Sequence, residues 1–191
     1  MLNYYKKKIY LPKIDNQGNT IGKIERWQAH FEGILHIGFT TLLQFKDQIL
    51  VQIRKHPIFD GRLDLSFSSH PYYKQNKLID NKTSIIETLT REWLWEDEQD
   101  LPKQSDIKFL FKIKYRSEDK QNQLGRILEH EINHYYIIDL EILPKPNPDY
   151  SYGYAFISKT KLKNLDLYPF KPTMFAPWVK KMLKKNYLDK L

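Results

Sequence analysis

Histidine and glutamate residues in three separated fragments are the part of this chain with the clearest chemical potential. Imidazole nitrogens and carboxylate oxygens together are ligands that first-row divalent metals such as Zn²⁺ and Mn²⁺ accept. Glu129 and Glu131 lie two residues apart, so on an extended strand their side chains project to the same side. Two adjacent carboxylates repel each other unless a cation lies between them. The candidate metal ligands are His30, His36, His70, Glu129 and Glu131.

Each fragment also has a plainer interpretation. An exposed edge strand with scattered glutamates would contain the same Glu129-His130-Glu131 run, and short motifs of this kind often match by chance. The three histidines would equally suit loops on which their rings are hydrogen-bonded polar groups. Residue types alone leave both interpretations open.

The order of the motifs along the chain resembles a known family. The run Ile24-Glu25-Arg26-Trp27-Gln28-Ala29-His30 comes first, Ser66-Phe67-Ser68-Ser69-His70-Pro71 and Glu129-His130-Glu131 follow, and Phe175-Ala176-Pro177-Trp178 comes last. This order resembles the type 1 isopentenyl-diphosphate isomerases, a branch of the Nudix superfamily, from about Tyr10 to Leu183. The resemblance implies one Zn²⁺ or Mn²⁺ site made of the three histidines and two glutamates.

The resemblance also implies roles in proton transfer. In this family a glutamate of the metal pair, assisted by a tyrosine, delivers a proton to an alkene, and these positions match Glu131 and Tyr115. A cysteine handles the second proton, but Ser68 occupies its position in a chain that contains no cysteine. A serine hydroxyl is a much poorer acid and base near neutral pH than a thiol of pKa ~8.5. We therefore expect Glu131, Tyr115 and Ser68 to be catalytic and the isomerase activity to be weak or altered.

The diphosphate side of the resemblance is less complete. Nudix helix carboxylates hold Mg²⁺ against a diphosphate, and Glu92 matches a key position, so it is the expected ligand of a second ion. Arg26 and Arg54 match basic positions, whereas Thr88 stands where relatives carry a helix arginine. Trp178 matches a tryptophan that covers a carbocation, although a core aromatic would fit equally. We expect Arg26, Arg54 and Trp178 to contact substrate.

Strands interrupted by a few helices are expected to position these residues. The spacing of Ile85, Leu89 and Trp93 predicts a helix over Ser84–Glu96. Alternation over Arg62–Ser68 predicts a strand whose apolar residues face one way and whose polar residues, including Ser68, face the other. The other predicted elements are strands over Ile9–Ile14, Thr20–Ile24, Ile37–Phe45, Gln48–Arg54, Lys108–Tyr115, Glu131–Ile142 and Tyr152–Ile157, and a terminal helix over Phe175–Asn186.

Composition and the predicted elements together indicate a globular α/β (α+β) protein. A chain of 191 residues with 41% hydrophobic residues can bury a core, and we expect one domain over residues 1–191. The resemblance implies a Nudix-like α/β/α sandwich with a mixed β-sheet. No apolar run of ~18 residues predicts a membrane span, the N-terminal residues do not resemble a secretory signal, and we expect a cytoplasmic monomer or homodimer. The net charge of +8 comes with no nucleic-acid-binding signature, so we interpret the basic clusters as solvated faces.

Three functions follow from these observations. The first is an isomerase-like metalloenzyme that acts on an isoprenoid or related diphosphate, with Mg²⁺ accompanying the diphosphate. The second is a Nudix hydrolase that cleaves a diphosphate bond, with Glu92 and the metal site activating water. The third is a binding module that keeps the fold without catalysis.

Overall fold

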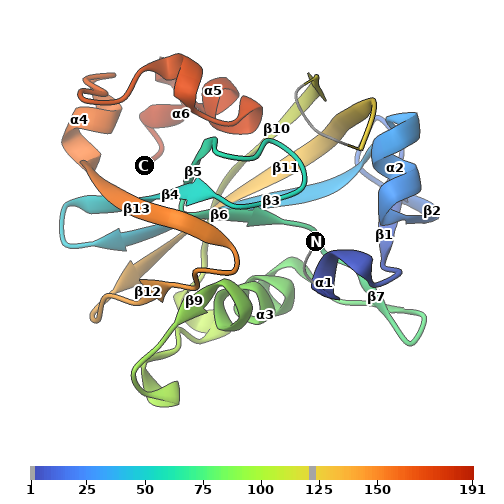
Figure 1. Ribbon diagram of the computed structural model, residues 1–191, viewed down its shortest axis with the longest axis horizontal. Coiled ribbons are helices and arrows are strands. Elements are labelled where there is room, and N and C mark those ends of the chain that lie inside the picture. Colours follow the sequence, from blue (N-terminus) through green and yellow to red (C-terminus); the bar gives the residue numbers. More distant parts are fainter. Residues whose placement is uncertain (1–2, 121–123) are drawn as a thin grey trace.

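A mixed β-sheet, shown in Figure 1, forms the centre of the protein. In the computed structural model, which describes residues 3–120 and 124–191, β3 (His36–Phe45) pairs in parallel with β11 (Ile127–Leu140). β11 pairs antiparallel with β10 (Lys108–Asp119), which is longer than the sequence predicts. The sheet also contains β1 (Tyr10–Ile14), β2 (Thr20–Glu25), β4 (Gln48–Arg54), β5 (Leu63–Leu65), β6 (Phe67–Ser69), β7 (Tyr73–Lys74), β8 (Lys77–Leu78) and β13 (Ser151–Ser158).

Helices cover both faces of this sheet, each above its own apolar core. In Figure 1, α3 (Asn81–Glu92) lies below the sheet, and α4 (Lys159–Lys163), α5 (Pro177–Met182) and α6 (Lys185–Leu188) lie above it. The predicted stripe of Ile85, Leu89 and Trp93 is fully buried in the core on the α3 side. Apolar residues at positions three and four apart bury one side of a helix, which explains this packing. The mixed sheet between two helical layers confirms the predicted α/β/α sandwich.

The helix of the α3 layer begins and ends earlier than Ser84–Glu96, the predicted range. Asp80 caps its N-terminus, because its Oδ1 accepts a hydrogen bond from the Thr83 backbone N–H at 3.0 Å. The helix ends at Glu92, because Trp93 adopts an extended conformation and pairs with Pro146 as part of a small sheet between β9 (Trp93–Leu94) and β12 (Lys145–Pro146). Glu92 is therefore the last helical residue.

The sheet divides between β3 and β4. These strands pair only next to their turn, at Gln44 with Ile49 and at Phe45 with Gln48. Beyond that point β5 pairs with β4, whereas β6 pairs with β3. The segment between Leu63 and Ser69 thus enters the space between two separating strands and contributes to both.

The single strand predicted over Arg62–Ser68 is interrupted at Ser66, which has a positive φ of 69°. Its hydroxyl holds this conformation by accepting from the Leu43 N–H and donating to the Leu50 carbonyl, both at 2.8 Å. Leu65 consequently joins the core under α5, and Phe67 joins the core on the α3 side. The prediction that the apolar residues of this run all face one way is wrong, because the kink turns the side chain of Phe67 to the opposite face of the sheet from that of Leu65.

Short helices account for the remaining differences. The sequence predicts no helix near the N-terminus, but α1 (Asn3–Lys6) and α2 (Arg26–Glu32) are present. The predicted terminal helix over Phe175–Asn186 is divided into α5 and α6, which a non-helical break at Leu183 separates. Three 3₁₀ turns complete the described elements, at Glu98–Asp100, Gln104–Asp106 and Pro172–Met174. Within residues 3–120 and 124–191, no helix is both long and apolar enough to cross a bilayer.

Candidate metal centre and adjoining pocket

The parallel pairing of β3 with β11 brings most of the predicted metal ligands together. His36 is the first residue of β3 and lies opposite Glu131 in the register of the two strands. β6 pairs with the other side of β3, and His70 directly follows β6. Glu129 lies two residues before Glu131 and reaches the same side of β11, as the sequence predicts. One donor atom from each of the five predicted ligands lies within 4.8 Å of every other: His30, His36, His70, Glu129 and Glu131.

His30 reaches this cluster from α2, which a glutamate caps at its start and a glycine at its end. The Glu25 carboxylate caps the helix by accepting from the Gln28 N–H at 3.0 Å, and Gly33 ends it with a positive φ of 64°. The His30 ring is buried, and its Nδ1 lies 2.6 Å from the Arg26 carbonyl oxygen. A carbonyl oxygen only accepts, so Nδ1 carries a proton and Nε2 is left as the free ligand atom.

The donor atoms of the cluster fit a divalent metal. In the described part of the chain, His30 Nε2, His36 Nε2 and Glu129 Oε2 are buried with no hydrogen-bond partner. His36 Nδ1 is fixed by the Ile34 carbonyl at 2.7 Å, so its Nε2 is also free to act as a ligand. Buried polar atoms are rarely left without partners, and three acceptors facing one point match the ligands of a cation.

Burial and neighbouring charges shift the pKa values of four of the five ligands in different directions. Burial lowers the pKa of His70 to about 4, so this ring is neutral. Burial also opposes a charge on His30, but the carboxylate of Glu129 outweighs it and raises the His30 pKa. The two carboxyl groups diverge: burial raises the pKa of Glu129, whereas for Glu131 the nearby rings of His36 and His70 overcome burial and hold the pKa well below its ordinary range.

Gly38 makes room for the Glu131 carboxylate. Gly38 lies on β3 beside β11, where a Cβ would collide with Oε2 of Glu131. Any side chain at this position would therefore displace the carboxylate from His70, whose Nε2 lies 2.8 Å from Oε1. The sequence contains no local signal for this requirement, because the two residues meet only across the sheet.

Tyr115 adds a hydroxyl to the metal cluster. It lies on β10 opposite Glu131 in the strand register and donates a hydrogen bond to Glu131 Oε2 at 2.8 Å. The ring is 4% exposed, and burial together with the two glutamates holds the Tyr115 pKa well above its ordinary value. The phenol therefore keeps its proton and directs it at the carboxylate. The structure thus brings together the two residues that the resemblance identifies as a proton-donating pair.

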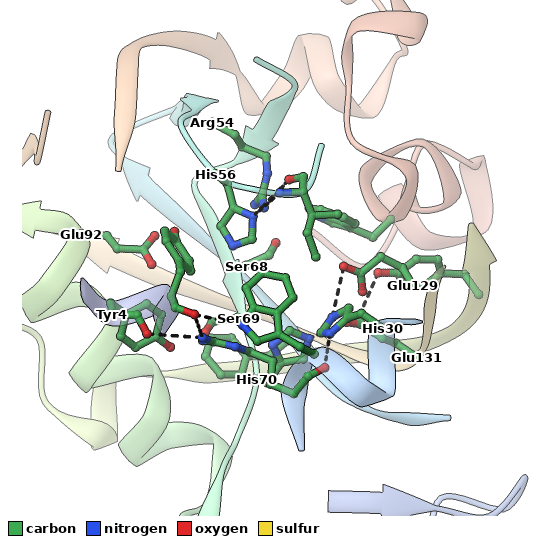
Figure 2. Close-up of a pocket in the computed structure, with 17 residues that line it drawn as sticks. Tyr4, His30, Arg54, His56, Ser68, Ser69, His70, Glu92, Glu129 and Glu131 are labelled. Carbon is green, nitrogen blue, oxygen red and sulfur yellow. Dashed lines mark hydrogen bonds and ion pairs between the residues drawn. The ribbon is translucent and has the colours of Figure 1, made fainter. Parts of the chain in front are cut away.

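A pocket adjoins the cluster, and Ser68 and Trp178 are among its lining residues. Figure 2 shows His30, Glu129 and Glu131 on one side of this pocket, with Glu92 and Tyr4 on the other. We call the five-residue cluster the metal end. The cavity volume is only about 40 Å³, room for a few water molecules at the ~10–15 Å³ that each requires.

The N-terminal helix α1 forms part of the pocket wall. Tyr4 and Tyr5 of α1 line it, and the ring of Tyr5 is 4% exposed and packs edge-on against His56 at 4.7 Å between ring centroids. Arg26, predicted to bind substrate, lines the pocket and donates from its Nη2 to the Tyr5 carbonyl at 2.9 Å. The Trp27 indole N–H donates to the same carbonyl at 2.9 Å. This N-terminal segment is thus held by the side chains at the start of α2.

Arg54 and Trp178, the other predicted substrate contacts, are engaged with each other and with a buried carboxylate. The Arg54 guanidinium pairs with Asp64 at 2.9 Å and lies over the Trp178 ring, 4.8 Å from its centroid. The Trp178 side chain is 3% exposed, and its Nε1–H donates to Asp64 at 2.9 Å. Both residues line the pocket, but each has a structural partner within the chain.

Glu92, the predicted ligand of a second ion, lines the pocket away from the metal end. Arg91 Nη2 donates to Glu92 Oε1 at 2.8 Å, and the Arg91 guanidinium stacks on the Tyr4 ring at 3.9 Å. Arg26 lies over the same Tyr4 ring at 5.1 Å. We call Arg26, Arg91 and Glu92 the guanidinium end. Burial raises the pKa of Glu92 against the opposing charge of Arg91.

The sequence interpretation missed three residues of this region. Thr88 occupies the expected position of a helix arginine, and Arg91, one turn later on α3, places a guanidinium beside Glu92. His56, which has no predicted role, lines the pocket, and burial lowers its pKa well below the ordinary value. Asp64 was predicted only as a polar strand residue. Of these residues, Arg91 had a usable signal in the sequence, because it directly precedes Glu92 near the end of the predicted helix and carries the opposite charge.

Comparisons with known proteins agree with this architecture. No family model matches the chain. Isopentenyl-diphosphate Delta-isomerase 1 of Photorhabdus laumondii subsp. laumondii is 27% identical over 186 residues, which cover 93% of this chain and 96% of that protein. The protein of the same name from Mesocricetus auratus is 25% identical over 164 residues, covering 80% of this chain and 70% of its own length. The chain is therefore a distant relative of these isomerases.

Solved structures show the same fold. DR0079 from Deinococcus radiodurans matches with a TM-score of 0.61 at 15% identity, covering 93% of this chain and 99% of that one. The MutT protein from Methanosarcina mazei Go1 matches with a TM-score of 0.52 at 12% identity, covering 81% and 93%. Identities this low establish the fold alone. The chain therefore has the fold of these proteins, which agrees with the Nudix-like fold expected from the sequence.

Proposed function

We propose that this protein is a metal-dependent, isomerase-like enzyme that acts on an isoprenoid or related diphosphate by acid–base chemistry. The observation that carries the proposal is a pair of complementary deficits in and directly beside one pocket. The metal end has buried acceptor atoms that lack a hydrogen-bond partner in the described chain. Three arginines beside the pocket each have a buried Nε–H that also lacks a hydrogen-bond partner there. Free acceptors suit a cation and free guanidinium donors suit an anion. The atoms concerned are His30 Nε2, His36 Nε2 and Glu129 Oε2, and Nε of Arg26, Arg54 and Arg91.

The metal end would hold one Zn²⁺ or Mn²⁺. Three imidazoles and two carboxylates suit either ion, and the fixed Nδ1 contacts of His30 and His36 support the required tautomers. Glu92 would contact a Mg²⁺ that arrives with the diphosphate, because carboxylates and phosphate oxygens are the ligands Mg²⁺ prefers. Bound metal would supply positive charge that fixes the Glu131 carboxyl and adjusts its acidity.

Glu131 and Tyr115 would add the first proton. The hydrogen bond between them, 2.8 Å long, keeps one proton shared beside the pocket. Adding this proton to one carbon of an alkene leaves a tertiary cation at the other carbon, which the Trp178 ring supports as part of the pocket wall. Loss of a proton from the carbon on the other side of the cation completes the double-bond shift.

Ser68 would receive that second proton on its oxygen and pass its own hydroxyl proton to the Asp64 carboxylate, which it contacts at 3.1 Å. The serine lines the pocket, and its hydroxyl lies 2.8 Å from Thr40 Oγ1 and 3.1 Å from Asp64 Oδ1. A hydroxyl is a weaker base than a thiolate, so this half of the reaction limits the rate. The expected activity is accordingly lower than that of a thiol-containing isomerase.

Substrate entry requires displacement of the N-terminal segment. A free volume of about 40 Å³ has no room for a diphosphate ester while Tyr5 is buried in the pocket. The contacts of this segment with Arg26 run through backbone carbonyls. A diphosphate that displaced them would gain charge-assisted bonds, which are about twice as strong as neutral ones.

Glu92 favours a second candidate function, that of a Nudix hydrolase. It is a buried carboxylate with a raised pKa and an arginine neighbour, lining the pocket where a diphosphate-bound ion would lie. Such a group is suited to activating water for attack on phosphorus. In this alternative Glu92 would carry the chemistry and the metal end would serve binding.

A labelling experiment separates the two functions. Metal-loaded protein is incubated in D₂O with isopentenyl diphosphate and a panel of related diphosphates. The isomerase-like function predicts deuterium in the hydrocarbon part of a product, abolished in Glu131→Gln and increased in Ser68→Cys. The hydrolase predicts phosphate or pyrophosphate release without carbon labelling, reduced most by Glu92→Gln. Glu96→Gln, on an exposed residue just beyond α3, is the matched control for Glu92→Gln.

The outcomes are distinct. Phosphate release with no deuterium in any product would overturn the isomerase-like function in favour of the hydrolase. Neither release nor labelling, together with retained binding of metal and pyrophosphate, would leave a binding module. A protein that takes up neither Zn²⁺ nor Mn²⁺ would contradict the metal end itself.

A further inference from the structure

Asp64 is a buried carboxylate that lies behind the pocket wall rather than in it. The residue is 0% exposed, in the middle of β5, and it is absent from the pocket lining. Its Oδ1 accepts from Trp178 Nε1 at 2.9 Å, from Ser68 Oγ at 3.1 Å and from the Leu65 N–H at 3.0 Å. Its Oδ2 accepts from Arg54 Nη1 at 2.9 Å. One side chain therefore holds two lining residues that the proposed reaction uses.

The donors around Asp64 determine the direction of a longer hydrogen-bond chain. Paired with Arg54, the Asp64 carboxylate is an acceptor only, so Ser68 must donate to it. Ser68 has one proton, so in its contact with Thr40, at 2.8 Å, Ser68 accepts and Thr40 donates. Thr40 in turn accepts from Asn133 Nδ2 at 2.9 Å. The order from donor to acceptor is Asn133, Thr40, Ser68, Asp64.

This order fixes what Ser68 offers to a ligand. A hydroxyl oxygen has one donor and two acceptor sites. The donor is committed to Asp64 and one acceptor site to Thr40, which leaves one lone pair of Ser68 for the pocket. A lone pair attracts a proton or a positive centre and repels an anionic oxygen.

We infer that Asp64 is a positioning residue, which turns the Ser68 lone pair and fixes the Trp178 ring toward the reacting hydrocarbon of the substrate. The inference rests on the proposed function and sharpens it. Phosphate oxygens are repelled from Ser68 and attracted to the guanidinium end, so a substrate binds with its diphosphate at Arg26 and Arg91 and its hydrocarbon at Ser68. A thiol is a weak hydrogen-bond donor and depends less on such an acceptor. Asp64 therefore compensates for the use of a hydroxyl at position 68.

The kinetic test compares Asp64→Asn in two backgrounds. An amide at position 64 can donate to Ser68, which would turn the hydroxyl proton into the pocket. We expect kcat for deuterium incorporation to fall at least tenfold with serine at position 68, with KM changed less than threefold. In a Ser68→Cys background the same change should lower kcat less than threefold. A merely structural Asp64 would lower kcat equally in both backgrounds, which would overturn the inference.

A spectroscopic test does not depend on turnover. The Trp178 indole N–H is bonded to Asp64, so its proton–nitrogen NMR resonance should move in Asp64→Asn and stay nearly unchanged in Ser68→Ala. Asp139→Asn is the control, since Asp139 is a carboxylate bonded to Lys108 at 2.8 Å and is absent from the pocket lining. An unmoved Trp178 resonance in Asp64→Asn would contradict the positioning role, whether or not any diphosphate is turned over.

Folding of the variant is controlled separately. Asp64→Asn leaves the Arg54 guanidinium buried without its counter-charge, and such a change can prevent folding. The paired variant Asp64→Asn/Arg54→Gln removes both charges and serves as the alternative background for both tests. The same dependence on serine or cysteine at position 68 is expected there, and equal kcat losses would again overturn the inference. If wild-type protein shows no labelling at all, the proposed function fails while the Trp178 resonance still tests the contact with Asp64.

Discussion

The two ends of the pocket carry opposite kinds of unsatisfied groups. The metal end presents buried acceptors, and its ring nitrogens are fixed from behind by backbone carbonyls. The guanidinium end presents buried donors, but its charged groups already contact the chain itself: Arg26 the N-terminal carbonyls and Arg91 the Glu92 carboxylate. The difference teaches that the metal end keeps several acceptor atoms free of hydrogen bonds and need release only the contact of His70 with Glu131. The guanidinium end must first release most of its charged groups from the chain itself.

Removing one ligand of the metal end should have the largest effect. His70→Ala eliminates one of five ligands, and we expect metal affinity to fall at least 100-fold. At a metal concentration 100 times the wild-type Kd, wild type should gain about 2.7 kcal/mol of stability and the variant almost none. Elemental analysis measures the bound metal, and thermal unfolding with added Zn²⁺ or Mn²⁺ measures the gain in stability. His134→Ala is the control, because the His134 ring contacts Asn81 and lies outside the cluster, and this variant should behave as wild type. Equal metal content in the His70→Ala and His134→Ala variants would contradict the assignment of the metal end.

Crowding the same end without removing a ligand should have a smaller effect. Gly38→Ala places a methyl group against the Glu131 carboxylate, so we expect about 1–3 kcal/mol of destabilisation and a 10- to 100-fold loss of metal affinity. Denaturant unfolding and metal titration test this. Gly22→Ala is the matched strand control, because nothing lies within 4 Å of the Cβ it would add. Unchanged metal affinity in Gly38→Ala would show that Glu131 does not need its observed position.

Opening the guanidinium end should increase its affinity for an anion. Tyr5→Ala removes the buried anchor of the N-terminal segment and weakens its hold on Arg26. Binding of magnesium pyrophosphate, measured by calorimetry, should tighten about tenfold, which corresponds to about 1.4 kcal/mol. Tyr152→Ala, on an exposed tyrosine outside the pocket lining, should leave it unchanged. Weaker binding in Tyr5→Ala would mean that the segment helps to form the anion site rather than covering it.

The pH dependence of metal binding should distinguish the histidines of the metal end. The His30 pKa is raised, so metal must displace its proton at and below that pKa, and affinity should rise up to tenfold per pH unit until the ring is neutral. His70, with a pKa of about 4, should contribute no slope near neutral pH. Without metal the sign is opposite: the charged His30 stabilises the protein most below its unfolded pKa of ~6.5, and this stabilisation is lost as pH rises through the folded pKa. A metal titration flat from pH 6 upward would contradict the assignment.

Local patterns explain why the metal end could be predicted and its supports could not. The two-residue spacing of Glu129 and Glu131 requires only that the segment be extended, and β11 satisfies that condition. The α2 helix was not predicted because its seven residues are too few for a clear periodicity, although Glu25 and Gly33 at its ends were usable signals. Gly38 carries no local signal, since its role depends on a carboxylate from a strand distant in sequence.

The same limit applies to the pocket wall. Alternation placed Asp64 and Ser68 on one polar face, and the two side chains do meet, but only because of a kink that alternation cannot anticipate. Arg54 matched a substrate-binding position by order along the chain, yet its pairing with Asp64 depends on which strands adjoin in space. Patterns within one element could be interpreted, whereas contacts that join three elements could not.

The kink at Ser66 also has an evolutionary consequence. The strand before it takes its register from β4, and the strand after it takes its register from β3. A change in one register therefore need not propagate to the other, because the Ser66 hydroxyl, rather than continuous pairing, joins them. Residue 68 can be exchanged in this framework without moving His70 out of line with β3 or Asp64 out of line with β4. Single substitutions on one side of the kink can therefore change a group that lines the pocket without shifting the strand on the other side.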